Sequence, residues 1–265
     1  MSTSSSRASG AAGLSFMIML AFPALLPAQS LWLDCHQHPA LALEVIKPNF
    51  SDETFLNNTT FPTAMLFLSL RYPITASTAV VTELPFAHGG VEFTLGSNGD
   101  ERISESALGN PYLGLEVGGR NSSFFAEIGA RAPVTRIDNL GGFIAALAEI
   151  ADRPEAFVPE YLPLIALANF RYRRPGGFAL RLRGGPSFWI NTEKGEDDDA
   201  TEWFVLYSAQ VGYETETAGV QLGASGRWFL TTEDDGFGEN TVHEFGMAAS
   251  LGLGRVWPGL AAAGY

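Results

Sequence analysis

The chain is poor in charged residues, in lysine and in cysteine. Asp, Glu, Lys and Arg make up 17% of its 265 residues, against roughly 25% in an ordinary soluble domain. Lysine occurs only at Lys47 and Lys194, and the net charge is −13, so nucleic acid is a poor partner because phosphate binding requires clustered positive charge. The single cysteine, Cys35, excludes an internal disulfide. A charged cytosolic enzyme and a nucleic-acid-binding protein are therefore disfavoured.

Residues 1–30 have the features of an export signal. Arg7 is their only charged residue, and residues 11–26 form an uncharged, largely apolar run. Ala28 and Ser30 are small residues at the spacing that a signal peptidase requires, which predicts cleavage after Ser30. Later in the chain no apolar stretch reaches the roughly 18 residues that a transmembrane helix needs. We therefore expect export without a helical membrane anchor.

The rest of the chain alternates apolar and polar side chains with a period of two, which is typical of β-strands. From Trp203 to Tyr213, for example, every second residue is apolar, and Ser208 and Gln210 lie between them. A shorter segment, Leu41–Ile46, is expected to form a first strand. The other alternating segments are 63–72, 80–86, 113–117, 124–131, 164–173, 178–183, 203–214, 220–230 and 243–253.

The connections between these segments alternate in length. Short links at 73–76, 119–122, 174–176 and 215–218 alternate with long ones at 87–111, 132–161, 191–201 and 231–240. Outer-membrane barrels have tight periplasmic turns and long extracellular loops, and a closed barrel is the only sheet that can cross lipid. The sequence predicts an all-β fold, an antiparallel up-and-down transmembrane β-barrel of about ten strands, within a range of roughly 8–12. A secreted soluble β-sandwich that binds ligands through its loops stays open as an alternative.

In these features the chain resembles bacterial outer-membrane β-barrel proteins. The resemblance is architectural and covers residues 63–254; segments such as Leu70–Pro73 and Gly109–Glu116 are similar to segments of uncharacterised or transporter-like outer-membrane families. It implies a location in the bacterial outer membrane, with lipid as the surrounding partner. We divide the chain into an export signal (1–30), an N-terminal segment with the first strand (31–62), the barrel (63–254) and a C-terminal segment or stunted last strand (255–265).

The polar positions of the strands are expected to face the barrel interior. Arginine is favoured there because it pairs bidentately with carboxylates in a low-dielectric space. The charges either form a salt-bridge network that fills a narrow barrel or a constriction that selects small solutes, and a barrel of about ten strands is close to the size that side chains fill. The set is Arg71, Glu83, Glu116, Glu127, Arg131, Arg171, Arg181, Arg183, Glu214, Arg227 and Glu244.

The long loop 132–161 contains the only helical pattern after the signal. Phe143, Ile144, Leu147 and Ile150 follow helical spacing, and Arg153–Pro154 ends the run. Because so many apolar residues would not stay in water, we expect a short helix in this extracellular loop. It either packs on the barrel rim or folds into the mouth as a plug.

Few residues are typical of catalysis or metal binding. Cys35, His36 and His38 are close enough in sequence to ligate a soft metal, and the acidic loops 193–199 and 233–236 carry oxygen ligands without a known motif spacing. His88 precedes a loop with several serines, which leaves a lipid-modifying barrel enzyme as an alternative. We predict no enzyme activity, no cofactor and no metal site, and a narrow or plugged barrel with a transport or structural role.

Overall fold

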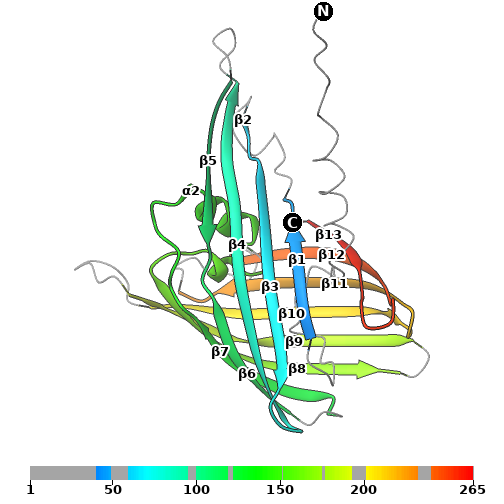
Figure 1. Ribbon diagram of the computed structural model, residues 1–265. Coiled ribbons are helices and arrows are strands. Elements are labelled where there is room, and N and C mark those ends of the chain that lie inside the picture. Colours follow the sequence, from blue (N-terminus) through cyan, green and yellow to red (C-terminus); the bar gives the residue numbers. More distant parts are fainter. Residues whose placement is uncertain are drawn as a thin grey trace, which may run out of the picture.

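The computed structural model describes residues 40–48, 59–94, 100–118, 122–150, 152–174, 177–192, 201–231 and 240–264 (Figure 1). The predicted export signal, the Cys35–His38 segment and the two acidic loops lie outside these ranges.

The described residues form one antiparallel sheet and two short helical elements (Figure 1). The helical elements are α2 (Leu140–Ala148) and the 3-10 helix η3 (Pro154–Ala156). Within the described ranges no helix is long and apolar enough to cross a membrane. The strands are β1 (Ala40–Ile46), β2 (Thr59–Thr60), β3 (Thr63–Pro73), β4 (Thr78–Thr94), β5 (Asp100–Leu108), β6 (Tyr112–Val117), β7 (Phe124–Arg131), β8 (Tyr161–Arg173), β9 (Phe178–Asn191), β10 (Thr201–Glu214), β11 (Ala218–Phe229), β12 (Thr241–Leu251) and β13 (Gly259–Gly264).

The sheet has up-and-down topology. Eleven strands follow one another in the order β1-β3-β4-β6-β7-β8-β9-β10-β11-β12-β13, and each pair is antiparallel. The two-residue strand β2 and the nine-residue strand β5 pair with the part of β4 that extends beyond β6. The predicted all-β, antiparallel up-and-down fold with one short helix is therefore confirmed in the described part of the chain.

The sheet is not closed into a barrel, which differs from the prediction. In the described residues no pairing joins β1 to β13. The ten expected strands are present and β13 is an additional one, so the path has an odd number of strands. Ten antiparallel pairings make β1 and β13 run in the same direction, whereas an antiparallel closure needs an even number. β13 is also only six residues long and pairs with Phe245–Ser250 alone.

The alternation in the sequence separates two faces of the sheet. We call the face with the buried side chains the inner face and the opposite one the outer face. On β3, Phe67 and Ser69 are buried on the inner face while Leu68 and Leu70 are exposed on the outer face. The same division places exposed apolar side chains on the outer face of the other strands, among them Leu113, Leu115, Ile128, Leu182, Leu222 and Met247.

Loop 132–161 folds against the inner face. α2 packs on β3, β4 and β5, and a buried cluster that includes Met65, Phe67, Ala145 and Phe157 joins the loop to the sheet. The side chain of Asn139 caps α2 by accepting a hydrogen bond from the Gly142 amide at 2.9 Å. We refer to residues 132–160 as the plug loop from here on.

The first strands cross the later strands of the curled sheet. In Figure 1, β1, β3 and β4 pass in front of β8 to β12 at a steep angle. The plug loop forms ion pairs with both groups, with Glu44 of β1 and with Arg227 of β11. The inner face therefore encloses the loop from two sides.

Candidate functional site

The charged residues of the inner face fall into two groups. The plug end lies beside the plug loop, and the turn end lies beside the short links that follow β3, β6, β8 and β10. Arg131, Glu83 and Arg227 belong to the plug end, and Arg71, Glu116, Arg181 and Glu214 belong to the turn end. The two groups differ in their burial and in their partners.

Arg153 of the plug loop is the centre of the plug end. Its guanidinium lies 2.7 Å from Glu44 Oε2 and 3.0 Å from Glu83 Oε2, and 3.8 Å from the centre of the Phe67 ring. Glu149 and Asp152 of the loop itself lie 3.5 and 3.0 Å from its Nε. Arg153 is 2% exposed, so one buried cation connects the loop to β1, β3 and β4.

Two further arginines complete the plug end. Arg131 Nη2 donates to Glu83 Oε1 at 2.6 Å and its Nη1 donates to the Asn110 carbonyl at 3.0 Å. Arg227 Nη2 donates to Glu155 of η3 at 2.5 Å, and its guanidinium lies above the Trp189 and Phe204 rings. Both arginines are fully buried, so the loop is held to β11 as well as to the first strands.

Burial affects the ionisation of the carboxyls in the plug loop. Burial raises the pKa of Glu149 well above its ordinary value and also raises the pKa of Asp152, although Arg153 opposes both shifts. Burial acts in the same direction on Glu155, but Arg227 and Arg131 outweigh it and lower the pKa of that carboxyl. Since four carboxylates contact Arg153, the cluster has more acids than this cation can neutralise.

At the turn end the ion pairs form between residues of the strands themselves. Arg71 on β3 pairs with Glu116 on β6 at 2.6 Å. Arg181 on β9 contacts Glu214 on β10 at 2.5 Å and donates to Gln221 on β11 at 2.7 Å. The Arg181–Glu214 pair joins neighbouring strands, whereas Arg71–Glu116 reaches across β4 and Arg181–Gln221 reaches across β10. None of them involves a residue of the plug loop.

The other residues of the predicted set lie on the same face. Glu127 is buried and accepts a hydrogen bond from the Tyr112 hydroxyl at 2.6 Å. Arg171 on β8 and Arg183 on β9 are half-buried, and Arg183 interacts electrostatically with Glu127. Glu244 on β12 is half-buried near the short last strand.

Sequence reasoning missed the residues through which the plug loop is attached. Glu44 alternates with Leu43 and Val45, so its parity already indicated an inner position. Arg153 was interpreted only as the end of a helix, and Glu155 was not considered. The signal that could have found them is a charged Arg-Pro-Glu segment directly after an apolar helix in a long loop.

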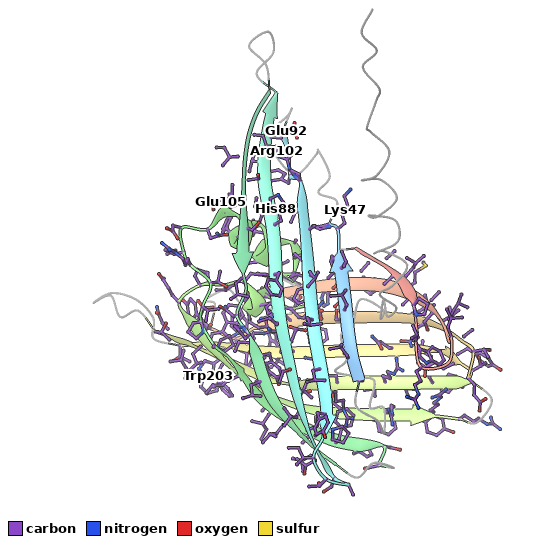
Figure 2. The ribbon with its side chains drawn as sticks, in the orientation of Figure 1. Lys47, His88, Glu92, Arg102, Glu105 and Trp203 are labelled. Atoms are coloured by element: carbon purple, nitrogen blue, oxygen red, sulfur yellow. The ribbon has the colours of Figure 1, made fainter. Side chains whose placement is uncertain are left out.

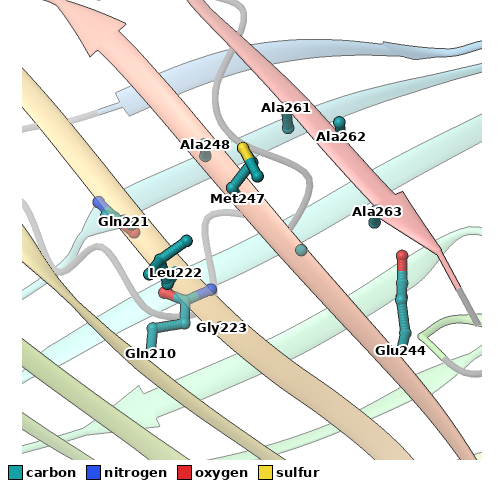
Figure 3. A pocket seen from close by; sticks show the side chains of 11 residues that line it. Gln210, Gln221, Leu222, Gly223, Glu244, Met247, Ala248, Ala261, Ala262 and Ala263 are labelled. Atoms are coloured by element: carbon teal, nitrogen blue, oxygen red, sulfur yellow. The ribbon is translucent and has the colours of Figure 1, made fainter.

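A small hollow lies beside the short last strand. Gln210, Gln221 and Glu244 line it together with small residues of β12 and β13, including Ala248 and Ala261 (Figure 3). Leu222 and Met247, which lie on the outer face, also line this hollow, so it lies at the edge of the sheet and not on the inner face alone.

The structure supplies little for catalysis or metal binding in the described ranges. His88 on β4 and Ser106 on β5 lie opposite each other on the outer face, with 3.0 Å between His88 Nδ1 and Ser106 Oγ. Figure 2 places His88 below Glu92 and Arg102 on the long β4–β5 hairpin. Among the described residues His88 is not seen to donate a hydrogen bond to a carboxylate, whereas a catalytic histidine needs a third group to orient it. Within the same residues no group of histidine, cysteine, aspartate and glutamate is arranged to hold a metal ion.

Comparison with known proteins assigns no family. No family model matches the chain, and no curated protein matches it.

Proposed function

We propose that the chain is a bacterial outer-membrane β-barrel protein that forms a narrow, plugged barrel for small solutes. The observation that carries this proposal is the chemistry of the two faces of the sheet. Apolar side chains such as Leu113, Phe124 and Ile128 are 63–67% exposed on the outer face, while arginines and glutamates are buried on the inner face. Lipid would cover the first set and stabilise it, as in barrels with a lipid-facing apolar band and a polar interior.

The lengths of the strands β8 to β12 agree with a membrane crossing. A tilted strand needs about 9–11 residues to cross the hydrocarbon layer. β8, β9, β10, β11 and β12 have 13, 14, 14, 12 and 11 residues. Each of them is long enough to cross, whereas β1, β6, β7 and β13, with 7, 6, 8 and 6 residues, are shorter than this length.

Aromatic residues on the outer face gather at two heights along the strands, one near each end. Near the short links Phe124 stacks on Phe170 with 4.7 Å between ring centres, and Tyr172 contacts Phe178 at 6.3 Å. Toward the opposite ends of the strands Phe188 contacts Trp203 at 4.5 Å. Aromatic girdles at both membrane interfaces are characteristic of such barrels, so the two levels support a membrane between them.

We also propose that the sheet closes between β1 and β13 in the membrane. Lipid offers no hydrogen-bond partner to the free edges of a sheet. Arg153 and Glu155 are two residues apart in the plug loop and pair with Glu44 of β1 and Arg227 of β11. Strands near both ends of the sheet therefore approach the same loop, which supports closure. The seam would be parallel because both edge strands run in the same direction.

A pair of matched substitutions tests the membrane proposal. Ile128 and Ile137 are 67% and 69% exposed, but Ile128 lies on the outer face of β7 and Ile137 lies in the plug loop. An arginine on the lipid face near the bilayer centre costs about 2–4 kcal/mol. Ile128→Arg should therefore reduce the fraction of mature protein that floats with liposomes, while Ile137→Arg should leave flotation unchanged.

Flotation and the heat-modifiable gel mobility of the wild type provide the baseline. Equal flotation of both variants would show that the outer face of β7 does not meet lipid. A mature protein that stays monomeric in solution without detergent would exclude the membrane proposal and favour the soluble β-sandwich.

A further inference from the structure

The last strand, β13, is weakly held at the edge of the sheet. Its sequence, Gly-Leu-Ala-Ala-Ala-Gly, contains no β-branched or aromatic residue, and glycine and alanine are depleted in strands. Leu260 is 77% exposed, and Ala261, Ala262 and Ala263 are exposed as well. β13 pairs with Phe245–Ser250 only, about half of β12. Backbone hydrogen bonds to β12 therefore hold β13 in place, with little help from side-chain packing.

The strand at the other edge, β1, is anchored by its side chains. Ala42 and Glu44 are 4% and 7% exposed, and Glu44 pairs with Arg153 of the plug loop at 2.7 Å. All seven residues of β1 also pair with β3. Of the two strands that end the sheet, β13 is therefore the one that can leave it.

Without β13 the two ends of the sheet are suited to each other. The path from β1 to β12 has ten strands, and its nine antiparallel pairings make β1 and β12 run in opposite directions. An antiparallel pair is slightly more stable per residue than a parallel one, and bacterial outer-membrane barrels have an even number of strands. With β13 in place β1 can meet only a parallel neighbour at the seam.

The plug end already brings β1 and β12 to the same part of the plug loop. Glu244 on β12 interacts electrostatically with Glu44 on β1 and with Asp152 and Arg153 of the loop. Because Arg153 attracts both glutamates, the cation of the loop reduces the repulsion between them. Among the described residues β13 pairs no further along β12 than Phe245. The approach of β1 and β12 therefore takes place beside the end of β13.

We propose that β13 is a releasable strand whose place on β12 is taken by β1, so that the sheet closes as ten antiparallel strands when β13 leaves. The proposal rests on the proposed function for closure in the membrane and adds a second closed form to it. The parallel seam retains β13, and the ten-stranded form expels it from the wall. Release also opens the hollow at this edge, because Ala261 and Ala263 form part of its lining (Figure 3).

Disulfide trapping in liposomes tests the exchange, with Cys35 replaced by serine in every variant. Met247 lies on the outer face of β12 opposite Ala262, so β13 separates it from β1 by two strand spacings, about 10 Å. This exceeds the limit of roughly 7 Å between the Cα atoms of a disulfide. We expect Met247→Cys to form a disulfide with one of three outer-face cysteines on β1, introduced in turn as Leu41→Cys, Leu43→Cys and Val45→Cys.

Two neighbouring proline substitutions provide a matched comparison. The Leu251 N–H donates to the Pro258 carbonyl at 2.9 Å, and hydrogen-bonded pairs alternate along an antiparallel ladder. The Ala262 N–H therefore points toward β12, and the Ala261 N–H points toward the free edge. Ala262→Pro removes a ladder bond and should raise the initial rate of the β1–β12 disulfide about fivefold. Ala261→Pro leaves the ladder intact and should keep that rate within about twofold.

The positive control is Met247→Cys with Ala262→Cys, which are cross-strand partners. If this pair forms its disulfide and none of the three β1 pairs does, or if both prolines change the rate equally, release of β13 is excluded. A protein that floats with liposomes and gives either result would lose this inference alone. A soluble protein that forms the β1–β12 disulfide would lose the membrane proposal alone.

Discussion

The plug end and the turn end of the inner face contain the same types of side chain in different proportions. At the plug end Arg131, Arg153 and Arg227 are almost fully buried, and the four carboxylates around Arg153 outnumber it. At the turn end the charges pair one to one, Arg71 with Glu116 and Arg181 with Glu214, and Arg171 and Arg183 nearby are only half-buried. The plug end also includes residues of a long loop, whereas the turn end is formed by the strands alone.

This difference separates a region that holds the loop from a region that joins the strands. Ion pairs in a buried, low-dielectric site depend strongly on each partner, because removal of one leaves the other charge uncompensated. We infer that the plug end holds the loop in place and that the turn end links strands of the sheet to one another.

The largest effect is expected from Arg153→Met at the plug end. The substitution leaves Glu44, Glu149 and Asp152 buried without their cation, a change that typically costs about 3–5 kcal/mol. The urea midpoint should fall, and protease should cleave the plug loop faster. In planar bilayers the variant should conduct more than the wild type because the loop no longer stays in the barrel.

An exposed arginine of the same loop provides the control. Arg136 pairs with Asp138 at 3.0 Å, and both side chains are largely exposed, so Arg136→Met should change stability by less than about 0.5 kcal/mol. Equal stability and conductance of the two variants would contradict the structural role of the plug end.

A smaller effect is expected from Arg71→Met at the turn end. Arg71 is nearly as buried as Arg153 and pairs with Glu116 at 2.6 Å. However, Glu116 keeps a second cation, because Arg171 also interacts with it electrostatically. We expect a loss of about 1–2 kcal/mol, less than for Arg153, in the same urea titration. A loss as large as that of Arg153→Met would remove the distinction between the two ends.

The sequence predicted the strands well because their period of two is imposed by burial on one face. All ten expected strands are present, and inner positions such as Glu83 and Arg131 follow from parity alone. Closure was predicted from the requirement that a membrane sheet have no free edges. That step failed in the described structure because residues 259–264 alternate weakly and form an eleventh strand that changes the parity of the sheet.

The attachment of the plug loop could not be predicted in the same way. The helical spacing of Ile144 and Leu147 indicated an apolar face but not the surface that it would contact. The position of Arg153 depends on the turn between α2 and η3, which brings it to Glu44, a residue more than a hundred positions earlier in the chain. Such contacts arise from tertiary packing, for which the local sequence carries no periodic signal.

The smallest effect is expected from pH, and it again concerns the plug end alone. Burial raises the pKa of Glu149 and Asp152, so both bind a proton more tightly when the loop is docked. Their contribution to docking is complete below their ordinary pKa values and is lost as the pH rises through the raised values. Glu155 has the opposite sign: its pKa is lowered, so its contribution is present above the ordinary value and is lost as the pH falls through the lowered one.

Docking of the loop should therefore be stronger at about pH 5 than at about pH 8, by on the order of 1 kcal/mol. The rate of proteolysis within the plug loop measures this difference, with an unstructured peptide as a standard for the activity of the protease at each pH. Glu149→Gln mimics the protonated carboxyl and should reduce the difference, while Asp138→Asn at the exposed pair should preserve it. Faster cleavage at about pH 5 than at about pH 8 would contradict the prediction, because the lowered pKa of Glu155 leaves its contribution the same at both pH values.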